Sequence, residues 1–158
     1  MTTAYDFDFT AIDGAPLPLK TFEGQALLVV NVASKCGFTP QYTGLQKIYS
    51  AYHARGFTVI GVPSNQFMWQ EPAKEMEIAA FCAVQYSVTF PMTEKTHVKG
   101  ARAHPFYQWM RKTLGHQAHP AWNFHKLLVN KRGEAVAGFK SGIEPQDPKL
   151  IAAIEAAL

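Results

Sequence analysis

Two apolar segments with an amphipathic segment between them constrain the fold of this chain more than any other feature. Leu27 to Val32 and Phe57 to Val62 are short, rich in β-branched residues and nearly without charge, which is typical of strands covered on both faces of a sheet. Between them, Thr39-Pro40 is a good helix start, apolar residues then recur at helical spacing, and Gly56 ends the pattern. Two such strands joined by one helix should lie parallel, with a right-handed crossover. The fold class is therefore α/β.

The rest of the chain adds strands and helices around this unit. Alternation and short apolar runs predict strands at Tyr5–Phe9, Leu17–Lys20, Phe90–Met92, Phe124–Val129 and Ala135–Phe139. Helical spacing predicts helices at Lys74–Tyr86 and Pro105–Leu114. A last helix is predicted from Pro148 to the C-terminus, with Asp147 as its N-terminal cap. A parallel unit early and an antiparallel hairpin late is the plan of a thioredoxin-like fold. We expect a central mixed sheet flanked by helices, with an N-terminal β-hairpin, in one domain spanning residues 1–158.

Charge and hydropathy exclude several classes of partner. The formal net charge of +3 is scattered, without a Lys/Arg run that could follow a phosphate backbone, so nucleic acid is not expected as a partner. The longest apolar stretch, Ala26 to Ala33, is far shorter than the ~20 residues that span a bilayer, so stable membrane insertion is not expected. The first residues lack the features of a secretory signal, which makes a reducing cytoplasm the expected compartment.

Cys36 lies in the loop that leaves the first central strand, three residues before Thr39. The unpaired N–H groups of a helix N-terminus and the neighbouring Lys35 would both favour its thiolate form. The alternative is an inert small side chain in a turn, because cysteine is commonly buried. A thioredoxin-type redox motif is excluded, since it requires a second cysteine where Thr39 stands.

Neutral hydrogen-bond donors lie next to two other predicted strands, after one of them and before the other. Gln66 should lie at the same carboxyl edge as Cys36, and Trp122 and Asn123 offer an indole N–H and an amide at the entrance of a later strand. Fixed neutral donors suit a thiolate that attacks an O–O bond, because negative charge moves to the leaving oxygen. Taken singly, each would more often be an ordinary loop or core residue.

The order of the motifs then makes the chain similar to the glutathione peroxidases. The matching segments are Asn31-Val32-Ala33-Ser34-Lys35-Cys36-Gly37, Asn65-Gln66-Phe67 with Gln70-Glu71-Pro72, Phe90-Pro91, and Trp122-Asn123-Phe124-His125-Lys126. The resemblance runs from about Tyr5 to the C-terminus. It implies a thioredoxin-like fold, reduction of hydroperoxides without a cofactor, and a catalytic tetrad of Cys36, Gln66, Trp122 and Asn123.

Cys82 is the only other cysteine. By position alone it is a buried structural thiol on a predicted helix. The resemblance implies a different role, because its segment is similar to the region where two-cysteine family members carry the resolving cysteine. Cys82 would then trap the sulfenic acid of Cys36 as a disulfide, its helix would unwind locally to reach it, and thioredoxin, or else glutathione, would be the reductant. A peroxide sensor that passes its disulfide to a partner protein, and a binding module without redox chemistry, remain as alternatives.

Some features depart from the family pattern or stand outside it. Met68 and Trp69 stand where many relatives have small residues, including Gly. The favoured interpretation is that both side chains pack beneath a loop. The alternative is that they form a bulky apolar rim of the active site, which would favour organic or lipid hydroperoxides. Only Gly115 to Ala121 separates a helix from Trp122, where tetrameric relatives carry a longer insertion, so the resemblance implies a monomer with an open site. His116 and His119 lie in a loop without a carboxylate at ligand spacing, so no metal site is expected, and His125 is expected at the surface or behind the site.

Overall fold

The computed structural model describes all 158 residues of the chain. Its helices and strands, in chain order, are β1 (Asp8–Thr10), β2 (Pro16–Pro18), β3 (Ala26–Val32), α1 (Gln41–Tyr52), β4 (Phe57–Pro63), α2 (Glu75–Tyr86), α3 (Pro105–Leu114), β5 (Lys126–Val129), β6 (Ala135–Phe139) and α4 (Pro148–Ala157). No helix combines the length and the apolar character that crossing a membrane requires.

The central sheet has four strands in the order β4-β3-β5-β6. β3 and β4 are parallel, β5 runs antiparallel to β3, and β6 runs antiparallel to β5. The strands β1 and β2 form a separate antiparallel hairpin near the N-terminus. This arrangement confirms the thioredoxin-like mixed sheet with an N-terminal hairpin that the sequence predicts.

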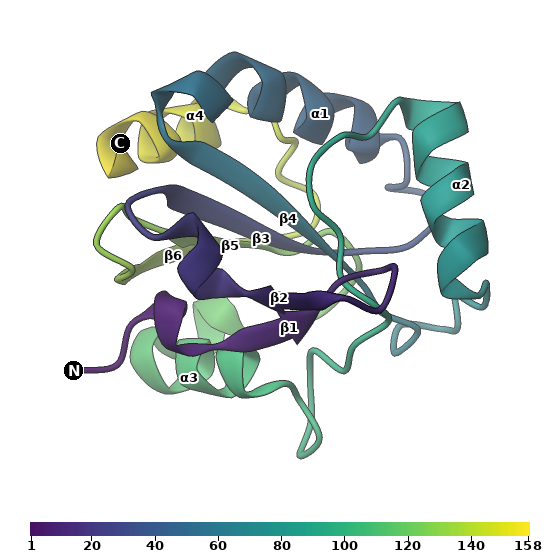
Figure 1. Cartoon of the computed structure of the whole chain (residues 1–158), viewed down its shortest axis with the longest axis horizontal. Coiled ribbons are helices and arrows are strands. Elements are labelled where there is room, and N and C mark those ends of the chain that lie inside the picture. The colour runs from purple at the N-terminus through teal and green to yellow at the C-terminus, as the bar shows by residue number, and fades with distance from the viewer.

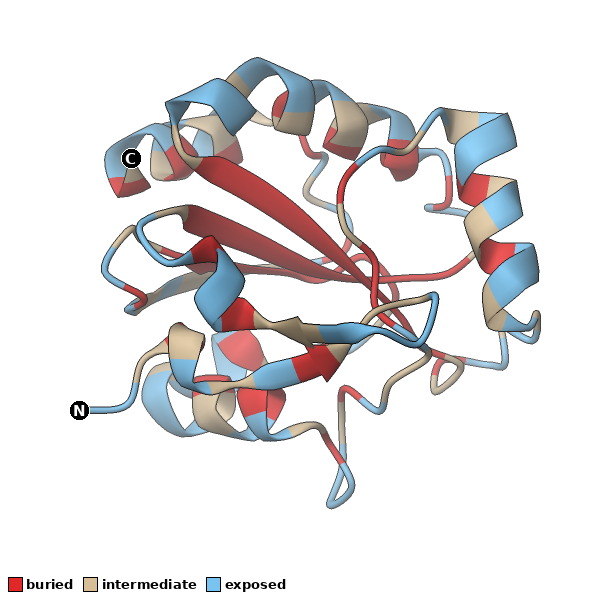
Figure 2. Cartoon of the chain, viewed as in Figure 1, coloured by how far each residue is buried: buried red, intermediate tan, exposed pale blue.

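The helices cover both faces of the sheet, and the side chains of each strand divide between two apolar cores. α1 and α4 lie on one face, and α3 and the hairpin lie on the other (Figure 1). Along β3, Leu28 and Val30 pack into the core below α1 and α4, whereas Leu27 and Val29 pack into the core with α3. Because successive side chains of a strand point to opposite faces, covering both faces buries all seven residues of β3 and of β4, the red strands of Figure 2.

One predicted strand is wrong. Phe90–Met92 forms no strand, and Met92 makes only an isolated parallel bridge to Gly61. The N–H of Gly61 donates to Pro91 O at 3.0 Å, and Thr93 N–H donates to Gly61 O at 2.9 Å. A short apolar run next to a proline is therefore pinned to the sheet edge at one point without extending the ladder.

Several element boundaries also differ from those that the sequence predicts. The hairpin strands are Asp8–Thr10 and Pro16–Pro18 rather than Tyr5–Phe9 and Leu17–Lys20, because short 3-10 helices occupy Ala4–Asp6 and Leu19–Phe22. Two further shifts concern α1 and β5. Helix α1 begins at Gln41, one residue after Pro40, and Thr39 does not cap it. Strand β5 begins at Lys126, because Phe124 has a left-handed backbone with φ of 65° and cannot belong to a strand. Both of these shifts fall in segments that lie at the candidate active site.

Candidate active site

The carboxyl ends of β3 and β4 bring two of the sequence motifs together. In their parallel register, Val32 pairs with Pro63, the last residue of each strand. The pairing continues past the strands, since Ser64 N–H donates to Val32 O at 3.2 Å. The loop that carries Cys36 and the loop that carries Gln66 therefore leave the sheet side by side, at the edge where α/β folds usually bind ligands.

The third motif reaches the same edge from the opposite direction. Because β5 runs antiparallel to β3, the residues that precede β5 lie beside the end of β3. Phe124 N–H donates to Asn31 O at 2.6 Å, and Asn31 Nδ2 donates to Trp122 O at 3.0 Å. These bonds fix Trp122 and Asn123 next to the start of the Cys36 loop.

Thr39 holds the Cys36 loop in a tight turn. Its hydroxyl accepts the Cys36 N–H at 2.9 Å and donates to Ala33 O at 2.9 Å, and its N–H donates to Cys36 O at 3.0 Å. This is the use that Thr39 has in place of the helix cap that the sequence predicts. The Cys36 sulfur is half-buried, unpaired with another cysteine, and accepts the Phe38 N–H at 3.4 Å. This contact helps to fix the position of the sulfur within the loop.

Asn123 is connected to the Cys36 loop through Gln70. Its side chain is fully buried, and Nδ2 donates to Gln70 Oε1 at 3.0 Å, while the Oδ1 atom has no hydrogen-bond partner. The Gln70 carbonyl in turn accepts the N–H of Lys35, the residue before Cys36, at 3.0 Å. Sequence reasoning did not single out Gln70, although it lies in a segment quoted as a motif.

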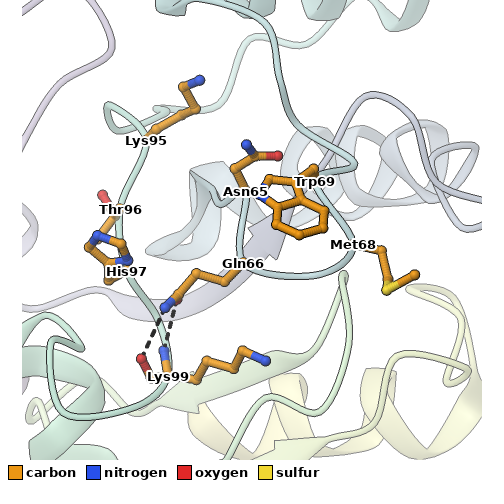
Figure 3. A pocket seen from close by; sticks show the side chains of 8 residues that line it. All are labelled: Asn65, Gln66, Met68, Trp69, Lys95, Thr96, His97 and Lys99. Atoms are coloured by element: carbon orange, nitrogen blue, oxygen red, sulfur yellow. Dashed lines mark hydrogen bonds between the residues drawn. The ribbon is translucent and has the colours of Figure 1, made fainter.

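Gln66 and Trp122 have other partners in this structure. Gln66 Oε1 accepts the Val98 and Lys99 N–H groups at 2.6 and 3.1 Å, and Nε2 donates to Lys99 O at 3.1 Å (Figure 3). The half-buried Trp122 ring packs edge-on against Phe67, with 5.9 Å between ring centroids. None of Gln66, Trp122 and Asn123 donates to the Cys36 sulfur. The fold gathers the predicted tetrad at one edge, and the donor roles of its three partners stay a prediction.

Glu71 is a buried carboxyl group that sequence reasoning passed over. It is 0% exposed, one oxygen accepts the hydroxyl of Ser34, and the other oxygen has no partner. Burial raises the pKa of this carboxyl, and the hydrogen bonds from Ser34 partly oppose that rise. Its backbone N–H donates to Asn65 Oδ1 at 3.0 Å. The only signal in the sequence was its place between Gln70 and Pro72 in the motif.

Cys82 occupies a different environment. It lies on α2, is 1% exposed, and belongs to the core that also contains Tyr42 and Ile78. Burial raises the pKa of the Cys82 thiol to about 11; the neighbouring Tyr42 hydroxyl lowers it and the Glu71 carboxylate raises it further. The half-buried Cys36 packs against the same core. Both cysteines are free thiols. Cys36 is partly exposed at the edge of this core, and Cys82 is buried within it.

Lys126 anchors the helix that follows the Cys36 loop. Its fully buried ammonium donates to Gln41 Oε1 at 2.6 Å and to Ser141 O at 3.0 Å, and also to Ile143 O. Burial lowers the pKa of Lys126 to about 7, but three oxygens that only accept hydrogen bonds favour retention of all three protons. Because Gln41 is the first residue of α1, this contact ties α1 to β5.

The histidines form no metal site. His125 is buried, not at the surface, and its Nε2 lies 2.8 Å from Gln117 O. No group of three or more His, Cys, Asp or Glu side chains is arranged to hold a metal ion.

Comparison with known proteins decides the family. The model of the glutathione peroxidase family matches residues 4–111. The chain belongs to the glutathione peroxidase family. The hydroperoxy fatty acid reductase gpx1 of Synechocystis is 45% identical, over 92% of this chain and 90% of that protein. The glutathione peroxidase-like peroxiredoxin gpx1 of Schizosaccharomyces pombe is 44% identical, over 92% and 94%.

Solved structures agree with this membership. The crystal structure of Trgpx in apo form superposes with a TM-score of 0.78 at 34% identity, covering 99% of this chain and 96% of that one. The crystal structure of T. cruzi GPX1 has a TM-score of 0.76 at 32% identity, covering 98% of this chain and 97% of that one. A thioredoxin-family thiol:disulfide interchange protein from Chlorobium tepidum, at 15% identity and a TM-score of 0.71, shares the fold.

Proposed function

We propose that this protein is a two-cysteine thiol peroxidase. The Cys36 thiolate attacks one oxygen of a hydroperoxide, the O–O bond breaks, and the alcohol leaves with a proton while Cys36 becomes a sulfenic acid. The Cys82 thiol then displaces the hydroxyl of that sulfenic acid, which releases water and forms a Cys36–Cys82 disulfide. Reduced thioredoxin restores both thiols and is itself oxidised to its disulfide; glutathione is the alternative reductant.

The environment of the Cys36 sulfur carries this proposal. Cys36 is partly exposed, its sulfur receives a backbone hydrogen bond from Phe38, and the loop around it is held by three hydrogen bonds of Thr39. A nucleophile that is fixed in place and partly exposed loses little entropy when it meets a small substrate. The membership of the chain in a peroxidase family adds independent support.

The donor roles of Gln66, Trp122 and Asn123 belong to the same proposal. Each would donate to the sulfur or to the departing oxygen, where negative charge develops. Their convergence at the ends of β3 and β4 supports this role. Asn123 would exchange its bond to Gln70 for the substrate, and Gln66 would exchange its bond to Lys99 O.

The resolving role of Cys82 requires that α2 opens. Only Ile78 and Cys82 are buried in this helix, whereas α1 buries Gln41, Tyr42, Leu45 and Ile48. An element with few buried apolar contacts opens at low free-energy cost. We therefore propose that α2 unwinds around Cys82 during turnover, so that the two sulfurs reach the geometry of a disulfide.

The names of relatives support the substrates and the reductant. Synechocystis relatives are hydroperoxy fatty acid reductases, and yeast relatives are glutathione peroxidase-like peroxiredoxins. We propose that hydrogen peroxide and fatty acid hydroperoxides are substrates, and that the protein acts as a monomer in a cytoplasm that supplies reduced thioredoxin. The short segment between α3 and Trp122 supports the monomer.

A coupled assay tests the function. Purified protein with thioredoxin, thioredoxin reductase and NADPH should consume hydrogen peroxide over many turnovers, and reduced glutathione should support slower turnover. Sustained turnover also separates an enzyme from a sensor, which would accumulate in the disulfide form. Absence of turnover with both reductants would refute the proposal.

A further inference from the structure

A cavity of about 600 Å³ lies beside the candidate active site, within the size range of small-molecule pockets. It opens over the loop after β4 and the segment before α3. Its lining residues are Asn65, Gln66, Met68, Trp69, Lys95, Thr96, His97 and Lys99 (Figure 3). Of these, Gln66 alone belongs to the predicted tetrad.

The charge of this cavity is of one sign. Lys95 and Lys99 lie at the two ends of the segment that faces Asn65 and Gln66 in Figure 3, and no acidic residue lines the cavity. Neither ammonium forms a salt bridge. The Lys99 ammonium lies 4.7 Å from the centroid of the Phe67 ring, which is a cation–π contact. The Glu75 carboxylate lies near Lys95, since it accepts the Lys95 backbone N–H at 3.0 Å, but it does not pair with the Lys95 ammonium. Both ammoniums are therefore available to an anion from solvent.

The rim of the cavity is apolar. Met68 and Trp69 are 70% and 75% exposed. The interpretation favoured from the sequence, that they pack beneath a loop, is therefore wrong, and they form a bulky apolar rim instead. Both have left-handed backbones, with φ of 58° and 51°. A non-glycine residue in this region is strained, and strain that persists at an exposed site points to a function there. The exposed rings and thioether offer a surface for a hydrocarbon chain.

The turn that carries the rim residues is hydrogen-bonded to the Cys36 loop. The rim residues belong to the turn from Phe67 to Gln70, which is closed by the Gln70 N–H donating to Phe67 O at 3.3 Å. The Gln70 carbonyl accepts the N–H of Lys35. A ligand whose charged end lies among the lysines and whose chain crosses this turn would extend toward Cys36.

We propose that this cavity is the subsite for the carboxylate of a fatty acid hydroperoxide, an inference that rests on the proposed peroxidase function. Lys95 and Lys99 attract the carboxylate, and Met68 and Trp69 contact the acyl chain. A cleft lined by one sign of charge raises the local concentration of an oppositely charged substrate. The enzyme therefore prefers the free acid to its uncharged ester.

The test compares linoleic acid hydroperoxide with its methyl ester, both below their aggregation concentrations. For the wild type, kcat/KM should be about tenfold or more higher for the acid, and this preference should shrink as salt is added. The double variant Lys95→Gln/Lys99→Gln should lose most of the preference. Lys20→Gln/Lys112→Gln removes the same charge from exposed positions elsewhere, and should keep it. Oleate should inhibit the wild type competitively, and inhibit the Lys95/Lys99 variant more weakly.

The outcomes separate this inference from the function on which it rests. A wild type that reduces hydrogen peroxide but shows no preference for the acid overturns the subsite and leaves the peroxidase intact. A wild type that reduces no hydroperoxide overturns the peroxidase. Equal losses in the two double variants, or a preference only for hydroperoxides in phosphatidylglycerol vesicles, would also overturn the subsite, because general charge or a lipid surface would then account for the data.

Discussion

The two cysteines of this chain lie in regions that differ in regularity and in how firmly they are held. The Cys36 loop is a short turn held by hydrogen bonds of Thr39 and by the Gln70 carbonyl, and it leaves Cys36 partly exposed. The segment around Cys82 is a regular helix, but it buries only two of its side chains. The first region is irregular and fixed, and the second is regular and weakly attached. Reactivity toward a small substrate needs the first arrangement, and delivery of a second sulfur over a distance needs the second.

The largest difference is expected on replacing each cysteine. Cys36→Ser should lower peroxidase turnover on the order of 10³-fold or more, because a hydroxyl is a far weaker nucleophile than a thiolate. Cys82→Ser should also stop thioredoxin-linked turnover. In a single turnover, however, it should oxidise Cys36 within about twofold of the wild-type rate, since Cys82 acts only after the peroxide has been reduced. Stopped-flow peroxide consumption distinguishes the two variants.

Alkylation of the reduced protein should separate the two thiols next. The pKa of Cys82 is raised to about 11, so its thiolate fraction near pH 8 is on the order of 10⁻³ and rises about tenfold per pH unit until that pKa is reached. Iodoacetamide followed by peptide mass spectrometry should label Cys36 first, and label Cys82 faster as pH rises. Equal labelling of both sites near pH 8 would contradict the enclosed position of Cys82.

A smaller effect is expected from a change in the stability of α2. Val84 is 77% exposed on this helix, and Val84→Ala should stabilise the helix by about 0.5 kcal/mol. If α2 must unwind before the disulfide forms, disulfide formation should slow about twofold. The matched control is Thr43→Ala on an exposed position of α1, which should leave that rate unchanged. An unchanged rate in Val84→Ala, with a measured gain in helix stability, would count against unwinding.

The smallest effect concerns Glu71, which contacts the Cys36 loop through Ser34 and adds to the raised pKa of Cys82 after burial. Glu71→Gln keeps an oxygen for the Ser34 hydroxyl and removes the negative charge. The pH dependence of Cys82 alkylation should then shift to lower pH, because the thiolate no longer lies near a carboxylate. The labelling rate of Cys36 provides the internal reference. A shift to higher pH would show that the carboxylate acts in another way.

The sequence predicts the regular part of this molecule well because its signals are local. The continuous apolar runs of β3 and β4, and the Asp147-Pro148 start of α4, depend on neighbours in the chain, and all are confirmed. Phe90–Met92 was wrong because an apolar run does not reveal how many hydrogen bonds a segment makes with a sheet edge. The sequence also predicted the family and the meeting of three motifs at one edge of the sheet.

The details of the site could not be predicted from the sequence, because they depend on partners that are distant in the sequence. Gln66 bonds to Val98 and Lys99, and Asn123 bonds to Gln70. Nothing local to Glu71 marks it as a fully buried carboxyl. The exposure of Met68 and Trp69 likewise follows from a turn whose left-handed backbone the residue types do not suggest.

The most direct measurement follows both sulfurs through one turnover. Reduced protein is mixed with one equivalent of hydrogen peroxide, quenched with an alkylating agent at successive times, and analysed by intact and peptide mass spectrometry. Oxidation of Cys36 alone should come first, as a sulfenic acid, and a Cys36–Cys82 disulfide should replace it as alkylatable Cys82 disappears. Oxidation of Cys82 before Cys36, or a sulfenic acid at Cys36 that persists without forming this disulfide, would contradict the division of labour between the two regions.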